Sequence, residues 1–471
     1  MSEEFDELDE DLNELIEKFE NSLFNDQSCF FDSEDLLEII DHYFAADKTQ
    51  MAKSAVDFAL SLYPNEVKFL IRNAQCISIE ESPQKAIKIL EEQRAKTPND
   101  DSLIFALATL YSQVGLSSKA ITLYQYLVKL DDKDIETYVL LGEEYIAIEN
   151  YSSAARVFKK ALLISPTDET LLQNFAYAAQ FLENPESSVL FLKKLCEKKP
   201  FSEQNWIAYS NLLFNIGNFF DAITALDLAI AINDKNAESY LSKAEAYISL
   251  ENYSQAINCF HEALEIKPDE YIILFFLGDA YEKQNNFEKA IYYFKEATKK
   301  LEFFADAWLG LAMSYFEKND FTNAEPNIKR AIELEPQNIH YKLTYAEMLY
   351  KENYISLSED IYQSLYEEGE ELAIVTINWA MAMVSNNRLM EAISLLRETI
   401  DNNKFEEPGI YFTLIELSSR ESYLKDHLDD YLFRLLLNYD VSLKMLEEYC
   451  PSLLKNPNYE TLIKTYINEK D

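Results

Sequence analysis

Prolines recur along the chain at intervals that are multiples of 34 residues. They stand at positions 64, 98, 166, 200, 268 and 336. When the chain is divided into lines of 34 residues from Ser33, eleven lines fit without insertion or deletion, and the last ends at Glu406. A fixed period of this length is the signature of a repeat architecture, in which each unit is one small supersecondary structure. The period therefore constrains the fold more than any other feature of the sequence.

Small residues occupy two positions of the 34-residue line almost without exception. Position 20 is Ala in nine lines and Ser in two, and position 8 is small in ten of the eleven lines. Positions 4, 7, 8 and 11 share one face at helical periodicity, and positions 20, 24 and 27 share a face of a second helix. Small residues let two helices approach closely, and large apolar neighbours fill the remaining space. Each line therefore predicts a pair of packed helices.

Glycine and proline mark the boundaries of these helices. Gly115 and Gly217 both fall at position 15, where we expect the turn between the two helices, and Pro83 and Pro185 fall at position 17, where the second helix begins. Proline at position 32 cannot continue the second helix. Pro326, at position 22, is the exception, and it is either tolerated near the first turn of its helix or kinks it. One helix pair cannot bury its apolar face alone, so neighbouring pairs should stack.

Two lines show the full pattern of residue types. One runs Tyr138-x-x-Leu141-Gly142-x-x-Tyr145 and continues with Ala154, Phe158, Ala161 and Pro166, and the other runs Trp308-x-x-Leu311-Ala312-x-x-Tyr315 and continues with Ala324, Ala331 and Pro336. At these residues the chain resembles the tetratricopeptide repeat (TPR) family, over about 374 of its 471 residues. The resemblance implies an all-α fold, a right-handed superhelical solenoid of about eleven helix-turn-helix repeats with helical caps.

The repeat register divides the chain into three expected segments. Residues 1–32 carry twelve acidic side chains and one lysine and form an acidic amphipathic N-terminal helix or cap, with Phe5 and Leu8 among its apolar residues. This helix either covers the first repeat or docks on a partner. Residues 33–406 form eleven tandem repeats. Residues 407–471 form a degenerate repeat and a C-terminal helical cap, or else a dimerisation element.

The acidic balance of the chain excludes several classes of function. With 83 acidic and 42 basic side chains the formal net charge is −41, which repels phosphate backbones and anionic membranes. We therefore expect no nucleic-acid and no membrane partner. The longest apolar run is seven residues, Tyr271 to Leu277, whereas a membrane span needs about 20. The five cysteines are odd in number, form no C-x-x-C pair and include Cys29, so we expect reduced thiols in a cytoplasmic protein.

No catalytic or metal-binding pattern is found in the sequence. The four histidines occupy different repeat positions far apart, and neither H-x-x-x-H nor a glycine-rich phosphate loop occurs. No serine or cysteine lies in a nucleophile frame such as G-x-S-x-G. We therefore expect a protein that is not an enzyme and that needs no cofactor or metal.

The TPR resemblance implies that positions 2, 5, 9, 12 and 13 face a concave groove that holds a peptide. Position 5 is apolar in ten of eleven lines, and positions 2 and 9 together carry nine acidic residues and one lysine. An apolar floor with acidic walls suits a basic amphipathic segment. The alternative is that position 5 widens the core and the charges form a solvated face. The predicted groove residues are Val139, Glu143, Ile146, Ile207, Asn211, Phe214, Leu241, Glu245, Ile248, Phe275 and Asp279.

These expectations favour a protein-interaction scaffold or adaptor that binds a basic or amphipathic peptide or helical segment in the groove. Two alternatives stay open. One is a structural protein that self-assembles through its terminal helices into a homo-oligomer, and the other is a non-catalytic regulatory subunit of an enzyme complex. Chaperone-binding members of the family hold a carboxylate with a clamp of basic residues and asparagines. Lys68 and Arg72 fit part of that clamp, but Glu38 stands where it needs asparagine. We therefore expect no such clamp.

Overall fold

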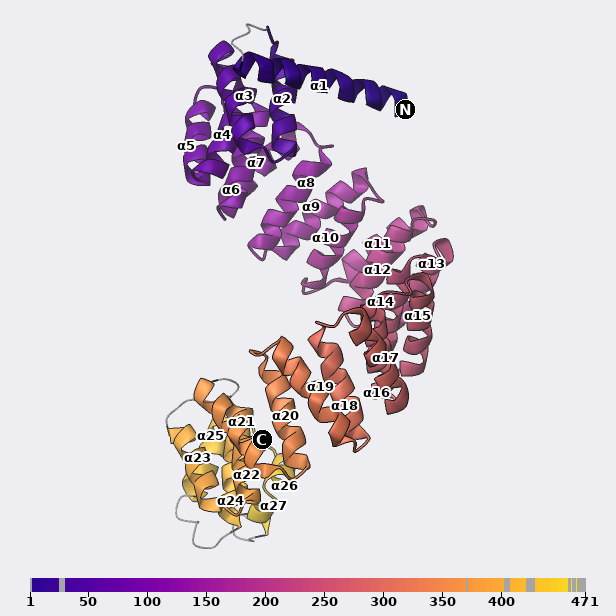
Figure 1. Ribbon diagram of the computed structural model, residues 1–471, viewed down its shortest axis with the longest axis vertical. Coiled ribbons are helices and arrows are strands. Elements are labelled where there is room, and N and C mark those ends of the chain that lie inside the picture. The colour runs from indigo at the N-terminus through magenta and orange to yellow at the C-terminus, as the bar shows by residue number, and fades with distance from the viewer. Residues whose placement is uncertain are drawn as a thin grey trace. The chain divides into compact units, whose positions relative to one another are not determined.

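A computed structural model describes residues 2–24, 30–369, 372–401, 407–420, 428–455, 459 and 463. Cys29 lies outside the described residues, and so do the side chains of Phe5 and Leu8. Every regular element within the described ranges is a helix, and the all-α fold of consecutive helix pairs is confirmed (Figure 1). The chain divides into two compact units, residues 1–246 and 247–471.

Among its described residues, the first unit contains thirteen complete helices and most of a fourteenth. They are α1 (Ser2–Phe24), α2 (Ser33–Ala45), α3 (Thr49–Leu62), α4 (Val67–Glu80), α5 (Pro83–Arg94), α6 (Asp101–Gln113), α7 (Ser117–Leu130), α8 (Ile135–Ala147), α9 (Tyr151–Ile164), α10 (Glu169–Gln180), α11 (Glu186–Lys198), α12 (Glu203–Asn215), α13 (Phe219–Ile232) and α14 (Ala237–Ser249).

The described helices of the second unit follow the same alternation of first and second helices as far as α23. They are α15 (Tyr253–Ile266), α16 (Tyr271–Lys283), α17 (Phe287–Lys300), α18 (Ala305–Glu317), α19 (Phe321–Leu334), α20 (Ile339–Lys351), α21 (Ile355–Glu368), α22 (Leu372–Ser385), α23 (Leu389–Asp401), α24 (Pro408–Ser419), α25 (Leu428–Asn438), α26 (Leu443–Tyr449) and α27 (Pro451–Leu454).

The helix boundaries keep the phase of the sequence repeat. The first helix of each line, from α2 to α20, begins at repeat position 1, and the second helix begins at position 17 in every line except one, where Pro185 precedes α11 as its N-cap. Asparagine or aspartate side chains cap many of these helices. Asn252, for example, accepts a hydrogen bond from the backbone N–H of Gln255 at the start of α15. Pro326 lies inside α19, which continues past it to Leu334, so this proline does not end its helix.

The turn between the paired helices is built at position 15 through a left-handed backbone. Gly115 and Gly217, the glycines that mark this turn in the sequence, have φ angles of 73° and 81°. Seven other lines place a residue with a side chain in the same conformation, namely Asp47, Glu149, Glu251, Asn285, Asn319, Asn353 and Asn387. Asparagine and aspartate tolerate this region better than most residues, whereas glutamate does not share the advantage. The two glutamates therefore hold local strain at their turns.

Replacing Glu251 with glycine should stabilise the protein. Its φ of 55° costs little for glycine, and we expect Glu251→Gly to raise the free energy of unfolding by about 1 kcal/mol. The matched control is Glu183→Gly. Glu183 occupies the same repeat position but is not among the residues with positive φ. Chemical denaturation should show a higher midpoint for the first variant and an equal or lower one for the second. Equal effects of the two changes would show that the left-handed backbone is not the cause.

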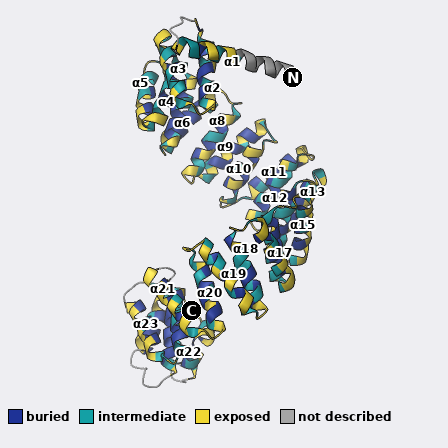
Figure 2. Cartoon of the chain, in the orientation of Figure 1, coloured by how far each residue is buried: buried dark blue, intermediate teal, exposed yellow. Residues whose placement is uncertain are grey.

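Close contact between paired helices explains the small residues at positions 8 and 20. In all eleven lines both positions are buried, and Figure 2 shows the buried residues lying where helices meet. Gly142 abuts the ring of Phe158 on the next helix. Gly278 and Gly310 both abut the ring of Phe294, and a Cβ atom added at Gly278 would lie 2.7 Å from that ring. A larger side chain at these places must displace a fully buried phenylalanine.

Adding one methyl group at Gly278 should destabilise the second unit. Alanine gains about 1 kcal/mol of helix propensity over glycine, but a buried ring that cannot move costs about 1–3 kcal/mol, so we expect a net loss. The free energy of unfolding should therefore fall in Gly278→Ala. In a Phe294→Leu background the same change should be neutral or stabilising. If Gly278→Ala has the same effect in both backgrounds, the glycine–phenylalanine contact does not set the helix separation.

Several tyrosines at position 11 connect their repeat to the one before it. Tyr111 donates a hydrogen bond to Glu91, and Tyr145 and Tyr315 contact Gln125 and Lys295, the partner lying 20 residues earlier in each pair. Each contact joins the second helix of one line to the first helix of the next. The hydroxyl therefore lets a bulky ring pack in the interface while its polar tip keeps a partner.

The first described helix packs onto the first repeat through its C-terminal half. Phe19 is fully buried and makes edge-to-face contacts with Phe31 and Phe58, with ring centroids 6.0 and 5.7 Å apart. Tyr43 of α2 donates a 3.0 Å hydrogen bond to Glu20 of α1. At the other end, α24 to α27 share an apolar core with α23, in which Cys450 donates its S–H to the backbone carbonyl of Phe412. No helix among the described residues is long and apolar enough to cross a membrane.

Candidate binding groove

The residues predicted to line a groove lie on one face of the first helices, at positions 2, 5, 9, 12 and 13, which we call the first-helix face. Most of the predicted residues are partly exposed, and Glu143 and Glu245 are exposed. Val139, Phe214 and Phe275 pack against the core with one side while the other side reaches solvent. Position 5 therefore contributes both to the core and to the surface, in agreement with part of each interpretation of the sequence.

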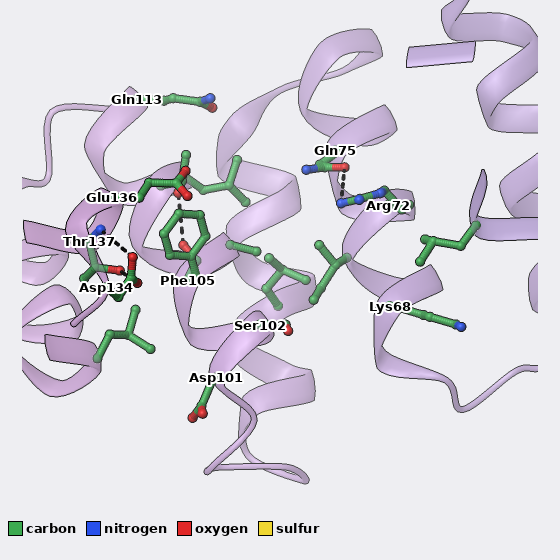
Figure 3. A pocket seen from close by; sticks show the side chains of 17 residues that line it. Lys68, Arg72, Gln75, Asp101, Ser102, Phe105, Gln113, Asp134, Glu136 and Thr137 are labelled. Carbon is green, nitrogen blue, oxygen red and sulfur yellow. Dashed lines mark hydrogen bonds between the residues drawn. The ribbon is translucent and has the colours of Figure 1, made fainter. Parts of the chain in front are cut away.

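One cavity on this face lies in the first unit between α4, α6 and α8. It has a volume of about 570 Å³. Lys68 and Arg72 come from α4, Phe105 from α6 and Glu136 from α8 (Figure 3). In this view the ring of Phe105 lies between the polar side chains of α4 and those of α8. Lys68, Phe105 and Glu136 stand at predicted positions, but none of the eleven predicted residues lines this cavity.

The two basic residues of this cavity are paired with acids of the same chain. Lys68 lies 2.7 Å from Glu34, and Arg72 donates two hydrogen bonds to the carboxylate of Asp41, at 2.6 and 3.0 Å. Burial lowers the pKa of Lys68, but the carboxylates of Glu34 and Glu66 together outweigh it and leave the pKa above its ordinary value. Because both cations are already neutralised, they are poorly placed to hold a ligand carboxylate as a clamp does.

A second cavity, of about 280 Å³, lies between α10, α12 and α14, and we call it the middle cavity. Tyr177 lines it from α10, Asn211 and Phe214 from α12, and Glu245 from α14. The structure therefore brings three predicted residues, Asn211, Phe214 and Glu245, around one space. The other predicted residues of the first unit lie on α8, α12 and α14 outside this lining, namely Val139, Glu143, Ile146, Ile207 and Leu241. The predicted residues of the second unit are Ile248, Phe275 and Asp279.

Acidic side chains on this face are partly desolvated although they reach the surface. Burial raises the pKa of Glu143 above its ordinary value, the charge of Glu144 raises it further, and the amide of Asn174 acts in the opposite direction. Burial also raises the pKa of Glu245. A raised carboxylate pKa means that the charged form is held at a cost. A cation that approaches these carboxylates reduces that cost.

A stronger case of the same effect is found in the second unit, on α16. Burial raises the pKa of Asp279, and burial with the neighbouring charge of Asp279 raises the pKa of Glu282 to about 7. Lys283 acts in the opposite direction, and Glu317 of α18 adds to the rise. Glu282 was missed by the sequence interpretation because position 12 is apolar in most lines.

Glu282 should make the stability of the protein depend on pH. Its folded pKa of about 7 lies above its unfolded value, so the folded state binds the proton more tightly, and stability falls as pH rises from about 4.5 to 7. We expect Glu282→Gln to have the same free energy of unfolding as the wild type near pH 4. At pH 8 we expect the variant to be about 1–2 kcal/mol more stable than the wild type. The exposed Glu262 supplies the control Glu262→Gln, which should show no such pH-dependent gain. A gain that is equal at both pH values contradicts the assignment.

Two aromatic residues of this face, Tyr177 and Phe181, were also not predicted. They occupy positions 9 and 13 of one line and have 45% and 50% of their surface exposed. Both positions belong to the set that the TPR resemblance places in the groove. The prediction for position 9, however, concerned its acidic residues, so the aromatic side chain was not included. No group of three or more His, Cys, Asp or Glu side chains that could hold a metal ion is found in the described part of the chain.

Consecutive helix pairs that bury small residues at fixed positions define an α-helical repeat protein. Residues 241–303 match one family model described as "Tetratricopeptide repeat", and residues 135–168 and 305–338 match a second with the same description. These segments of the chain are therefore tetratricopeptide repeats, as the sequence resemblance implied.

Known relatives are similar to this chain over part of their length. The BBSome complex member BBS4 of Bos taurus is 21% identical over 267 residues, which cover 57% of this chain and 51% of the relative. The protein O-mannosyl-transferase TMTC1 of Homo sapiens is 24% identical over 215 residues, which cover 45% of this chain and 24% of the relative. The chain thus spans about half of the first relative and a quarter of the second. The crystal structure of the yeast Tom70 has 17% sequence identity to this chain. The match covers 91% of this chain and 98% of the Tom70 chain, with a TM-score of 0.39.

Proposed function

We propose that this protein is a non-catalytic scaffold that captures a basic or amphipathic segment of another protein on its first-helix face. Membership of the TPR family supports a protein-interaction scaffold in general. The observation that carries the finer proposal is the middle cavity, where the aromatic side chains of Tyr177 and Phe214 and the carboxylate of Glu245 surround one space.

The electrostatics of the chain favour a positively charged ligand. A formal net charge of −41 attracts basic partners over distances of about the Debye length and accelerates their encounter. Glu143 and Glu245 then act at short range, because burial has raised the pKa of both and a nearby cation stabilises their charged form. Apolar side chains such as Phe214 supply the anchor contacts that hold the segment after encounter.

Reversing two charges should weaken this capture without unfolding the helices. We expect the double variant Glu143→Lys plus Glu245→Lys to bind a fluorescent amphipathic peptide with lysines on its polar face at least about tenfold more weakly than the wild type, because each acid becomes a repulsive cation. Fluorescence anisotropy measures the dissociation constant, and circular dichroism checks that helicity is kept.

The control for net charge is Glu197→Lys plus Asp234→Lys. Both residues are exposed and lie off the first-helix face, on α11 and in the corner after α13, so this variant changes the net charge by the same amount. It should lose only the small affinity that is due to long-range attraction. If both double variants weaken binding equally, the first-helix face is not the binding site.

The two alternatives from the sequence can be separated by other measurements. Light scattering of the full chain, compared with a chain that lacks residues 407–471, tests self-assembly through the C-terminal helices. Affinity purification followed by mass spectrometry tests whether the chain is a regulatory subunit of an enzyme complex. A monomer at all concentrations that still binds the basic peptide agrees with the scaffold proposal.

A further inference from the structure

Three aromatic side chains meet at the surface of the first unit, and we call them the aromatic cluster. They are Tyr151 of α9, Tyr177 of α10 and Phe181, the residue that directly follows α10. Tyr151 and Phe181 are stacked with ring centroids 4.4 Å apart and an interplanar angle of 26°. Tyr177 meets Phe181 edge to face at 5.2 Å and Tyr151 at 6.4 Å. The helices α9 and α10 are consecutive in the chain and pack against each other (Figure 1). The cluster therefore joins the second helix of one repeat to the first-helix face of the next.

The aromatic cluster is more exposed than its packing role requires. Tyr177 and Phe181 have 45% and 50% of their surface in contact with solvent. Position 8 of the same helix, Ala176, is 3% exposed and makes the core contact for this turn. Exposed aromatic rings gathered in one place are typical of interaction sites, and Tyr177 also lines the middle cavity. Tyr177 thus connects the aromatic cluster to the space that we propose as the binding site.

Carboxylates approach the aromatic cluster from more than one side. Glu245 lines the middle cavity together with Tyr177. Glu143 of α8 lies near Asn174, which is one helical turn before Tyr177 on α10. Burial, Tyr177 and the charge of Glu149 together raise the pKa of Tyr151, which places Glu149 close to the cluster. Aromatic faces next to carboxylates are the surroundings that a planar cation prefers.

We propose that the aromatic cluster is a subsite for an arginine side chain of the partner segment, with the guanidinium against the exposed rings and its charge balanced by Glu143 and Glu245. The inference deepens the proposed function and rests on it. Arginine fits better than lysine because its flat, weakly hydrated head stacks on rings while its N–H groups reach carboxylates, whereas an ammonium is a compact and strongly hydrated charge. A purely aliphatic side chain would bring no positive charge to the neighbouring acids.

Three matched peptides test the subsite. They share one amphipathic pattern of leucine and alanine and carry arginine, lysine or citrulline at all cationic positions, citrulline being the neutral analogue of arginine. We expect the arginine peptide to bind the full-length protein about tenfold more tightly than the lysine peptide, although both have the same charge. The citrulline peptide, which keeps the shape of arginine without its charge, should bind most weakly. Fluorescence anisotropy at fixed salt measures all three.

Variants of Phe181 assign the preference to the aromatic cluster. Phe181→Leu keeps an apolar side chain without a π face, and it should reduce binding of the arginine peptide to the level of the lysine peptide. Phe181→Trp keeps a ring and should keep the preference. Phe220→Leu is the control, since Phe220 is 73% exposed on α13 and lies outside the cluster. Because Phe181 is half exposed, circular dichroism and thermal unfolding should show all three variants folded.

The outcomes separate this inference from the proposed function. If the arginine and lysine peptides bind equally while Glu143→Lys plus Glu245→Lys weakens both, the groove stands and the arginine subsite is wrong. If Phe181→Leu leaves the arginine preference intact, the subsite is not at the aromatic cluster and the inference is also wrong. If none of the peptides binds the wild-type protein, the proposed function itself is wrong.

Discussion

The close approach of paired helices at positions 8 and 20 is the constraint on which the rest of the structure depends. A glycine, alanine or serine at each place lets a ring such as Phe158 or Phe294 lie directly on the opposite backbone, and the resulting contact has no room for a further methyl group. Because small residues at these positions recur along the chain and set the spacing within each helix pair, the helix starts repeat with the period of the sequence. Fixed spacing therefore follows from side-chain volume at a few positions.

The same constraint leaves the first-helix face available for binding. Positions 4, 7, 8 and 11 of each first helix pack in the core. Positions 2, 5, 9, 12 and 13 therefore face away from it. Ala176 and Tyr177 show this division on adjacent residues, since the first is 3% exposed and the second 45%. Residues on the face can vary from line to line without disturbing the fold. Each unit can therefore carry cavities of different size and charge on an unchanged scaffold.

The helices and their register could be predicted from the sequence, because each line contains the whole local pattern. The turns at Gly115 and Gly217 could also be predicted, but the same backbone at Glu149 and Glu251 could not, since the connection and not the side chain imposes it. Asn211, Phe214 and Glu245 line one cavity in the structure, whereas the cavity around Phe105 depends on how that ring packs and on which ion pairs Lys68 forms. Such pairings join residues of different lines and leave no periodic signal. The three domain boundaries and the groove residues as a binding site stay predictions.

The acidic character of the chain has a local consequence that its net charge alone does not show. Fully solvated carboxylates keep ordinary pKa values. Burial raises the pKa of Glu143, Glu245 and Glu282, because it opposes their charge. The unliganded protein therefore carries an electrostatic cost on its first helices. Binding of a cation lowers the pKa of these groups and removes part of that cost, so affinity for a basic segment and stability are linked through the same side chains. Protonation at mildly acidic pH removes the same cost by neutralising the carboxylates. Because a neutral carboxyl group no longer attracts a cation, a basic ligand should bind less tightly as the pH falls.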